Sequence, residues 1–167
     1  MPRKKLKSYT SSKIKRSGAG GGASVVKESP LSHPNDYFVL ILADFERAVS
    51  RLRESLSQPY SETVRDSSLM RFEFTSELSW KVLRIYLKEE LKLKDVEGLN
   101  SPKGVFREAF KQGLIEDEPF WLETMDNRNL IVHTYKEEVA EKIYPTLPKV
   151  LSLCQDLLAV LKERKDD

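Results

Sequence analysis

Apolar residues recur at helical spacing along most of the sequence from residue 35 onward. The first such stretch places large apolar side chains every three or four residues, with charged residues between them, and it predicts an amphipathic helix that ends before Pro59. Ser61 can cap a second helix, and neither Gly nor Pro interrupts the following stretch until Gly98. Apolar residues cover more than one face of this second stretch, so we predict a long central helix over 61–91, wedged between other helices.

Three further helices are expected in the second half of the chain. Ser101-Pro102 supplies an N-cap followed by proline at the first helical position, so a short helix is predicted over 102–112, with Gly113 as its C-terminal stop. Asp117-Glu118-Pro119 then opens a fourth helix, because acidic residues are favourable at the positive end of a helix dipole. We expect this fourth helix to carry Arg128.

The last helix has a start signal and an internal break. Thr134 and Glu137 match the T-x-x-E capping box, which predicts that a fifth helix begins there. Pro145 and Pro148 interrupt its apolar stripe, so a kink is expected at that point. Strand signals are scarce throughout. The predicted fold class is therefore all-α, an up-and-down helical bundle of about five helices over residues 31–167.

The first 30 residues differ in composition from the rest of the chain. They contain eight Lys and Arg residues and one Glu, a net charge of +7, so the remaining residues carry −5 of the total of +2. A Gly-, Ala- and Ser-rich run at 17–24 offers nothing to bury. We therefore predict that residues 1–30 form a disordered basic arm. Such an arm attracts nucleic acid through phosphate neutralisation, or it serves only as a solubilising extension, and the sequence leaves both open.

The composition also limits the chemistry. Cys154 is the only cysteine, so an internal disulfide is excluded, and two histidines with one cysteine fall short of a zinc site. The longest apolar run has seven residues, far below the roughly 20 that span a bilayer. We expect a cytoplasmic protein with no membrane association, no bound metal and no cofactor.

One segment of eight residues carries most of the reactive groups. Its polar members include Arg128, Asn129, His133 and Tyr135, and the residues between them are mainly apolar. In the simpler interpretation, Arg128 forms a salt bridge with a neighbouring acid such as Asp126. His133 and Tyr135 then only close a helix end, which is the commoner use of isolated residues of these types. In the other interpretation, the segment is a functional site.

An arginine and a titratable histidine without metal ligands suit phosphodiester chemistry. The imidazole moves the proton, while the guanidinium binds the phosphate and its developing charge. On an uninterrupted helix Arg128 and His133 differ by about 140° and share no face. If the helix instead ends near Val132, His133 can fold back toward the arginine. RNA cleavage through the 2′-hydroxyl needs both a base and an acid, and the motif supplies only one histidine per chain, so a homodimer would provide the second.

Three stretches of the sequence carry a family resemblance. The spacing Arg128-x4-His133-x-Tyr135 resembles the R-x4-H-x-Y signature of HEPN domains. With the stretches 72–81 and 101–110, the chain is similar to the nucleotidyltransferase substrate-binding branch of these domains, from Asp36 to Glu163. This resemblance implies a small helical protein that pairs with a separate minimal nucleotidyltransferase, often as a toxin–antitoxin module. The chain lacks a Gly-Ser followed by Asp-x-Asp, so it is not itself the transferase.

The resemblance also implies roles for the motif. The HEPN member of such a pair is thought to be a metal-independent RNase, which the transferase silences by adding AMP to the motif tyrosine. By position, Arg128 and His133 would cleave RNA. Asn129 would support them, and Tyr135 would accept the AMP. The alternative is a non-catalytic subunit that binds a nucleotide or substrate for the transferase, and a purely structural helical adaptor is a third interpretation.

Overall fold

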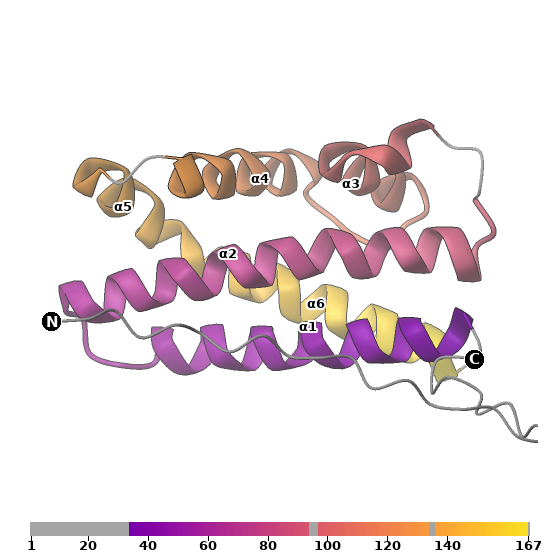
Figure 1. The fold of residues 1–167 in the computed structure, drawn as a ribbon, viewed down its shortest axis with the longest axis horizontal. Coiled ribbons are helices and arrows are strands. Elements are labelled where there is room, and N and C mark those ends of the chain that lie inside the picture. Colours follow the sequence, from indigo (N-terminus) through magenta and orange to yellow (C-terminus); the bar gives the residue numbers. More distant parts are fainter. Residues whose placement is uncertain (1–33, 94–96, 134–135, 167) are drawn as a thin grey trace, which may run out of the picture.

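The computed structural model describes residues 34–93, 97–133 and 136–166 of the chain (Figure 1). The α-helices are α1 (Pro34–Leu56), α2 (Glu62–Ile85), α3 (Pro102–Lys111), α4 (Glu118–His133), α5 (Glu137–Ile143) and α6 (Leu147–Asp166). Shorter turns are the π-helical η1 (Tyr86–Glu90) and the 3-10 turns η2 (Glu97–Asn100) and η3 (Tyr144–Thr146). The predicted basic arm at 1–30 lies outside the described residues, so its disorder stays a prediction.

Every regular element within the described ranges is a helix, and these ranges contain no strand. The predicted all-α fold class is therefore confirmed. None of the helices described here combines the length and the apolar character that crossing a membrane requires.

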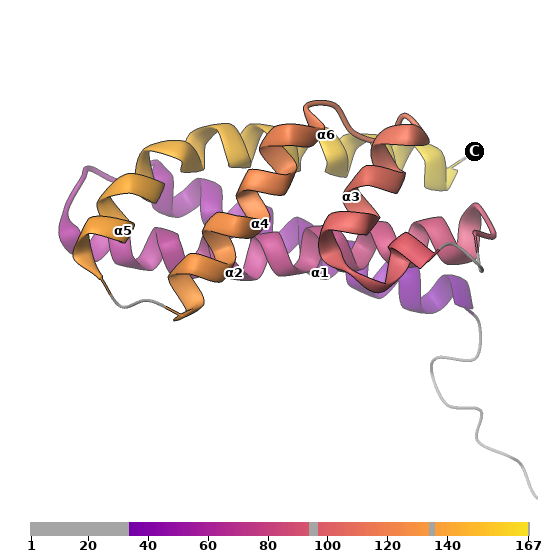
Figure 2. The ribbon, with the colours of Figure 1, turned by 90° about the horizontal axis from the view of Figure 1, so that it is seen from above.

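The central helix of the bundle is α2. On one side of it lie α1 and α6, and on the other side α3, α4 and α5 form a second layer (Figure 1). In the view from above, α3 and α4 run obliquely across α2 (Figure 2). Buried residues of α2 face several of these neighbours, as predicted for a helix wedged between others. The turn η1 extends the helical path to Glu90, close to the predicted end at Leu91.

Apolar side chains fill the spaces on both sides of α2. The largest fully buried ones come from both layers and include Phe38, Phe45, Leu52, Phe72, Leu83, Phe106, Trp121 and Leu147. Phe106 of α3 and Trp121 of α4 stack with their ring centroids 4.7 Å apart, so aromatic packing joins these two helices. Cys154 of α6 is also fully buried, and this burial raises the pKa of its thiol, so the residue behaves as a small uncharged core group.

Local hydrogen bonds account for the predicted helix starts. The hydroxyl oxygen of Ser61 accepts a hydrogen bond from the Val64 amide at 3.1 Å, which caps α2. The hydroxyl oxygen of Ser101 accepts one from the Gly104 amide, also at 3.1 Å, which caps α3. Gly113 follows the end of α3 with a φ of 66°, a conformation that glycine adopts without steric cost.

A close backbone contact fixes the entry into α3. A Cβ atom on Gly104 would lie 2.0 Å from the carbonyl oxygen of Gly98 in η2, so no larger residue fits there unless the backbone moves. The two segments can therefore approach each other only because position 104 has no side chain.

The interruption predicted in the last helix is confirmed. Pro145 lies in the turn η3, which separates α5 from α6. Pro148 lies at the start of α6, where its missing N–H costs no helical hydrogen bond. Because of this break, α5 stays in the layer of α3 and α4, while α6 runs along α1 (Figure 1).

Candidate functional site

The motif segment occupies the second half of α4. All buried residues of this helix lie in its first half, so packing around Trp121 anchors the helix and the second half extends beyond it. The Arg128 side chain is only 26% exposed, whereas Asn129 and His133 are exposed on the surface.

Arg128 faces α2 and pairs there with Glu77. Its Nη2 lies 2.9 Å from Oε2 of Glu77, and its Nη1 donates a hydrogen bond to Oδ1 of Asn129 at 3.0 Å. The Nε of Arg128 is buried and has no hydrogen-bond partner among the described residues. Two neighbouring groups thus hold the guanidinium plane in one orientation.

The expected salt bridge between Arg128 and Asp126 is wrong. Residues two apart on a helix point in different directions, so the Asp126 carboxylate cannot turn toward Arg128. Instead Asp126 pairs with Lys103 of α3, with Nζ 2.6 Å from Oδ1. The simpler interpretation had the right type of bond and the wrong partner, because the acid that binds Arg128 comes from another helix.

Glu77 is the centre of a polar cluster on α2. Its Oε2 also accepts a hydrogen bond from Trp80 Nε1 at 3.0 Å, and its Oε1 lies 2.9 Å from Nζ of Lys81. Partial burial acts to raise the pKa of the Glu77 carboxyl, but the hydrogen bonds from Trp80 and Lys81 and the charges of Lys81 and Arg128 outweigh it. The net result is a lowered pKa, so Glu77 is ionised at neutral pH and holds Arg128 as a charged pair.

The stretches 72–81 and 101–110, which share the family resemblance, both contact the motif segment of α4 or the residues just before it. The stretch 72–81 supplies Glu77, and the stretch 101–110 supplies Lys103, which binds Asp126 just before the motif arginine. Sequence reasoning assigned no role to Glu77. Its one local signal is the i,i+4 spacing from Lys81, which gives no indication of a bond to Arg128.

His133 and Arg128 do not come together within one chain. The helix α4 ends at His133, one residue past the expected end near Val132, and His133 itself is helical, so its side chain does not fold back toward Arg128. On a continuous helix the two side chains are separated by about 140°. No hydrogen bond joins them in the described part of the chain, and His133 stands exposed at the end of the helix.

The predicted capping box at Thr134 and Glu137 is wrong. The N-cap of α5 is Lys136, and Glu137 is the first residue of the helix and not the third. Its carboxylate is bound by Arg65 of α2. Thr134 and Tyr135 lie outside the described residues, so the role of Tyr135 as AMP acceptor stays a prediction.

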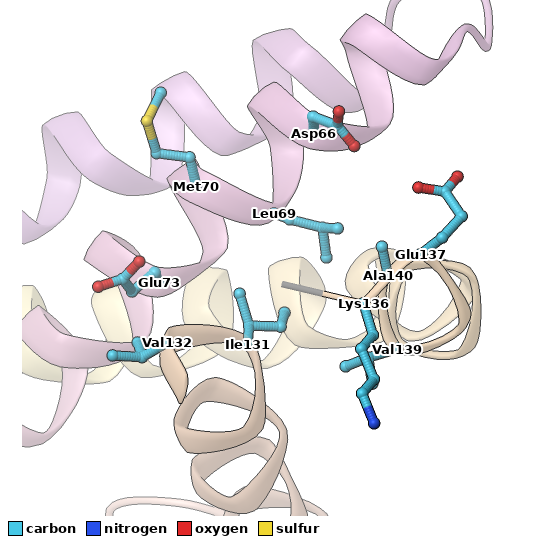
Figure 3. A pocket seen from close by; sticks show the side chains of 10 residues that line it. All are labelled: Asp66, Leu69, Met70, Glu73, Ile131, Val132, Lys136, Glu137, Val139 and Ala140. Atoms are coloured by element: carbon cyan, nitrogen blue, oxygen red, sulfur yellow. The ribbon is translucent and has the colours of Figure 1, made fainter. Parts of the chain in front are cut away.

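A cavity of about 540 Å³ lies next to the end of α4 (Figure 3). Its lining comes from α2, α4 and α5: Asp66, Leu69, Met70, Glu73, Ile131, Val132, Lys136, Glu137, Val139 and Ala140. Apolar side chains form most of this lining, and carboxylates lie around it (Figure 3). This volume falls within the range of small-molecule sites, and the mostly apolar lining suits an apolar or aromatic ring of a ligand. The described residues contain no cluster of three or more His, Cys, Asp or Glu side chains that could hold a metal ion.

The sequence is similar to known proteins over most of the described domain. The family described as "Nucleotidyltransferase substrate binding protein like" matches residues 40–163. A curated protein of Haemophilus influenzae, named "Probable ribonuclease HepT", is 33% identical over 103 residues, which are 62% of this chain and 70% of that protein.

Two solved structures resemble the fold. A crystal structure of a Thermus thermophilus protein has a TM-score of 0.62 and 37% sequence identity, and the match covers 69% of this chain and 96% of that chain. A Haemophilus influenzae structure, described as revealing the fold of a substrate binding domain of a nucleotidyltransferase, has a TM-score of 0.57 and 28% identity. That match covers 78% of this chain and 99% of the other. The matched family span includes Glu77, Lys103 and the segment from Asp126 to His133.

Proposed function

The chain belongs to the nucleotidyltransferase substrate-binding protein-like family, and we propose that it is a HEPN-type RNase that pairs with a separate minimal nucleotidyltransferase. Cleavage is metal-independent and uses Arg128, His133 and Asn129. One observation carries the proposal: Glu77 and Asn129 hold the Arg128 guanidinium in a fixed orientation on the helix whose last residue is the surface-exposed His133.

Arg128 keeps the donors that a phosphate needs. A guanidinium has five N–H groups, and only one on each terminal nitrogen is used by Glu77 and Asn129. The second N–H on each of these nitrogens remains for the oxygens of a phosphodiester. Because the guanidinium is oriented before RNA binds, less conformational freedom is lost on binding. Its positive charge is also in place for the transition state.

His133 performs the proton transfer. It lies in the last turn of α4 and is exposed on the surface, where RNA can reach it. Since Arg128 and His133 of one chain point in different directions, a second copy of the chain supplies the remaining catalytic group. The active form is a homodimer in which two motif segments face each other.

The exposed apolar side chains of α2 support such a dimer. Met70 and Phe74 are 56% and 59% exposed and lie one turn apart, an unusual position for large apolar residues on a helix surface. Met70 also lines the cavity together with Ile131 and Val132, the residues directly before His133. A second copy that covered Met70 and Phe74 would therefore lie next to the motif.

The RNase proposal is tested with full-length protein, RNA and a chelator. Wild type should cleave, and His133→Ala should lower the rate by about 10²- to 10⁴-fold, the usual contribution of a general acid or base. Arg128→Lys keeps the positive charge but loses the planar guanidinium, whose N–H groups match two phosphate oxygens. It should therefore be nearly as impaired as Arg128→Ala.

His33→Ala is the matched control, because His33 is the other histidine of the chain and lies outside the motif. It should cleave like wild type. An unfolded His133→Ala variant would support the packing role of the motif instead. A monomer in light scattering at the assay concentration would contradict the two-copy mechanism.

Tyr135 is the site at which the partner transferase silences the RNase. Its phenolic oxygen attacks the α-phosphorus of ATP, a new O–P bond forms, pyrophosphate leaves and the phenolic proton passes to solvent. The added AMP places a bulky anion close in sequence to His133. Intact-mass spectrometry after incubation with the transferase and ATP should show an AMP adduct on wild type. The same adduct on Tyr135→Phe would place the acceptor elsewhere.

A non-catalytic nucleotide-binding subunit is the second candidate function. The cavity of about 540 Å³ beside the motif favours it, as does the description of the Haemophilus influenzae structure as a substrate binding domain. A folded wild type that cleaves no RNA and binds ATP in calorimetry, with loss of binding in Leu69→Trp, would favour this function over cleavage.

A further inference from the structure

Arg65 is a buried arginine that the proposed chemistry does not use. It lies near the start of α2 and is only 3% exposed, although its charge favours solvent. Its Nε and Nη2 donate hydrogen bonds to Oδ1 of Asp66 at 2.9 and 2.8 Å. Its Nη1 and Nη2 donate to the two carboxylate oxygens of Glu137, the latter at 3.0 Å. Every N–H-bearing nitrogen of the guanidinium therefore has an anionic partner.

The bond to Glu137 joins distant parts of the chain. Glu137 is the first residue of α5 and lies 72 positions after Arg65. The N-cap of α5 is Lys136, whose side chain makes no capping hydrogen bond. The start of α5 is therefore held by a side chain of α2 and not by a local cap. Figure 3 shows Glu137 reaching from α5 toward the part of α2 that carries Asp66.

Two ion pairs on α2 bracket the motif histidine. Glu77 binds Arg128 before His133, and Arg65 binds Glu137 after it. The two anchoring residues are separated by about 18 Å along α2, at 1.5 Å per residue. Both ends of the segment that carries His133 are thus attached to the same rigid helix.

We propose that Arg65 is a positioning residue, which fixes the start of α5 relative to the end of α4 and so holds His133 in place for proton transfer. The catalytic part of this inference rests on the proposed RNase function. Charge-assisted bidentate pairs are directional as well as strong, which suits them to fix one helix end against another. A displacement of about 1 Å in a catalytic group can cost about 10²-fold in rate.

Glu137 is the better position to change, because its side chain is 60% exposed. Glu137→Ala removes the link to α5 without leaving a hole in the core, whereas a change at Arg65 could prevent folding. Asp66→Asn is the matched control. It removes the other carboxylate from the same guanidinium and leaves the link between α2 and α5 intact.

Cleavage kinetics form the first arm of the test. In full-length protein, Glu137→Ala should lower kcat for RNA cleavage about 10- to 100-fold, with KM within about threefold of wild type. Glu137→Gln keeps one oxygen that can accept from Arg65, so it should recover part of the loss. Asp66→Asn should keep kcat within about threefold. An unchanged kcat in Glu137→Ala, or an equal loss in Asp66→Asn, would overturn the catalytic part.

Hydrogen exchange forms the second arm and does not depend on cleavage. The amides of Val139 and Ala140 bond to the Lys136 carbonyl oxygen at 3.0 and 3.2 Å and report on the first turn of α5. In Glu137→Ala they should exchange at least about tenfold faster than in wild type, and in Asp66→Asn at the wild-type rate. Equal exchange in all three proteins would overturn the positioning role. If wild type cleaves no RNA, the proposed function fails, and the exchange rates still decide whether Arg65 fixes α5.

Discussion

The two halves of α4 are held to the bundle in different ways. The first half is anchored by apolar packing: Trp121 is 1% exposed and stacks on Phe106, and Met125 is buried beside it. From Asp126 to His133 no residue of the helix is buried. That second half is held mainly by ion pairs, from Glu77 to Arg128 and from Lys103 to Asp126, and only Ile131, which is partly buried, packs against the core.

This difference separates stability from function along a single helix. Apolar burial contributes strongly to the free energy of folding but has no directional preference. It therefore makes the helix pack against the bundle without fixing how its polar groups point. Ion pairs with partial exposure add little stability, but their geometry fixes how a polar group points. We therefore expect substitutions in the first half to change the free energy of unfolding, and those in the second half to change activity with little effect on unfolding.

The largest expected effect is the loss of Trp121. Trp121→Ala removes a fully buried ring and leaves a cavity against Phe106, which should cost about 3–5 kcal/mol in the free energy of unfolding. Urea denaturation measures this loss. Leu130→Ala, in the second half and at a side chain that is 41% exposed, is the control and should cost less than about 1 kcal/mol. Similar losses of unfolding free energy at both positions would refute the distinction between a first half of α4 that stabilises the fold and a second half that adds little stability.

The same division explains what could be predicted from the sequence. Helix periodicity follows from burial of one face, and the caps at Ser61 and Ser101 depend on neighbours three residues away, so local patterns were sufficient. The partner of Arg128 was predicted wrongly as Asp126, because Glu77 comes from another helix and no local spacing points to it.

The capping box failed for a related reason. Glu137 has the spacing of a capping residue, but a buried guanidinium 72 positions away in the sequence binds its carboxylate. The Glu137 carboxylate thus takes part in a tertiary ion pair and not in a local helix cap. The family resemblance identified the motif residues, whereas the contacts of Glu77 and Arg65 became apparent only from the packing of α4 and α5 against α2.

The second expected effect is on activity at Glu77. Glu77→Gln removes the charge that pairs with the Arg128 guanidinium, so the guanidinium is less well oriented. The kcat for RNA cleavage, measured in the presence of a chelator, should fall about 10- to 100-fold. The melting temperature should change by no more than about 3 °C, because Glu77 and Arg128 both keep contact with solvent.

The pKa of Glu77 is lowered, so the ion pair with Arg128 is intact at neutral pH. Its contribution to stability is lost only as the pH falls through that lowered pKa.

Glu73→Gln is the control for Glu77. Glu73 lies one turn earlier on α2 and faces the cavity, and it forms no ion pair with the described residues. It should retain wild-type cleavage. A higher rate in Glu77→Gln would mean that Glu77 competes with phosphate for Arg128 and does not position it.

The smallest expected effect is at the pair of Lys103 and Asp126, which also holds the second half of α4. The two side chains are 38% and 62% exposed, so water and salt screen their attraction despite a separation of 2.6 Å. A double-mutant cycle with Lys103→Ala and Asp126→Ala should give a coupling energy of about 0.2–1 kcal/mol that shrinks at high salt. Activity should fall less than in Glu77→Gln, because neither residue touches Arg128. A coupling energy above about 2 kcal/mol would show that this ion pair anchors α4 as packing does, and the distinction between its two halves would then be lost.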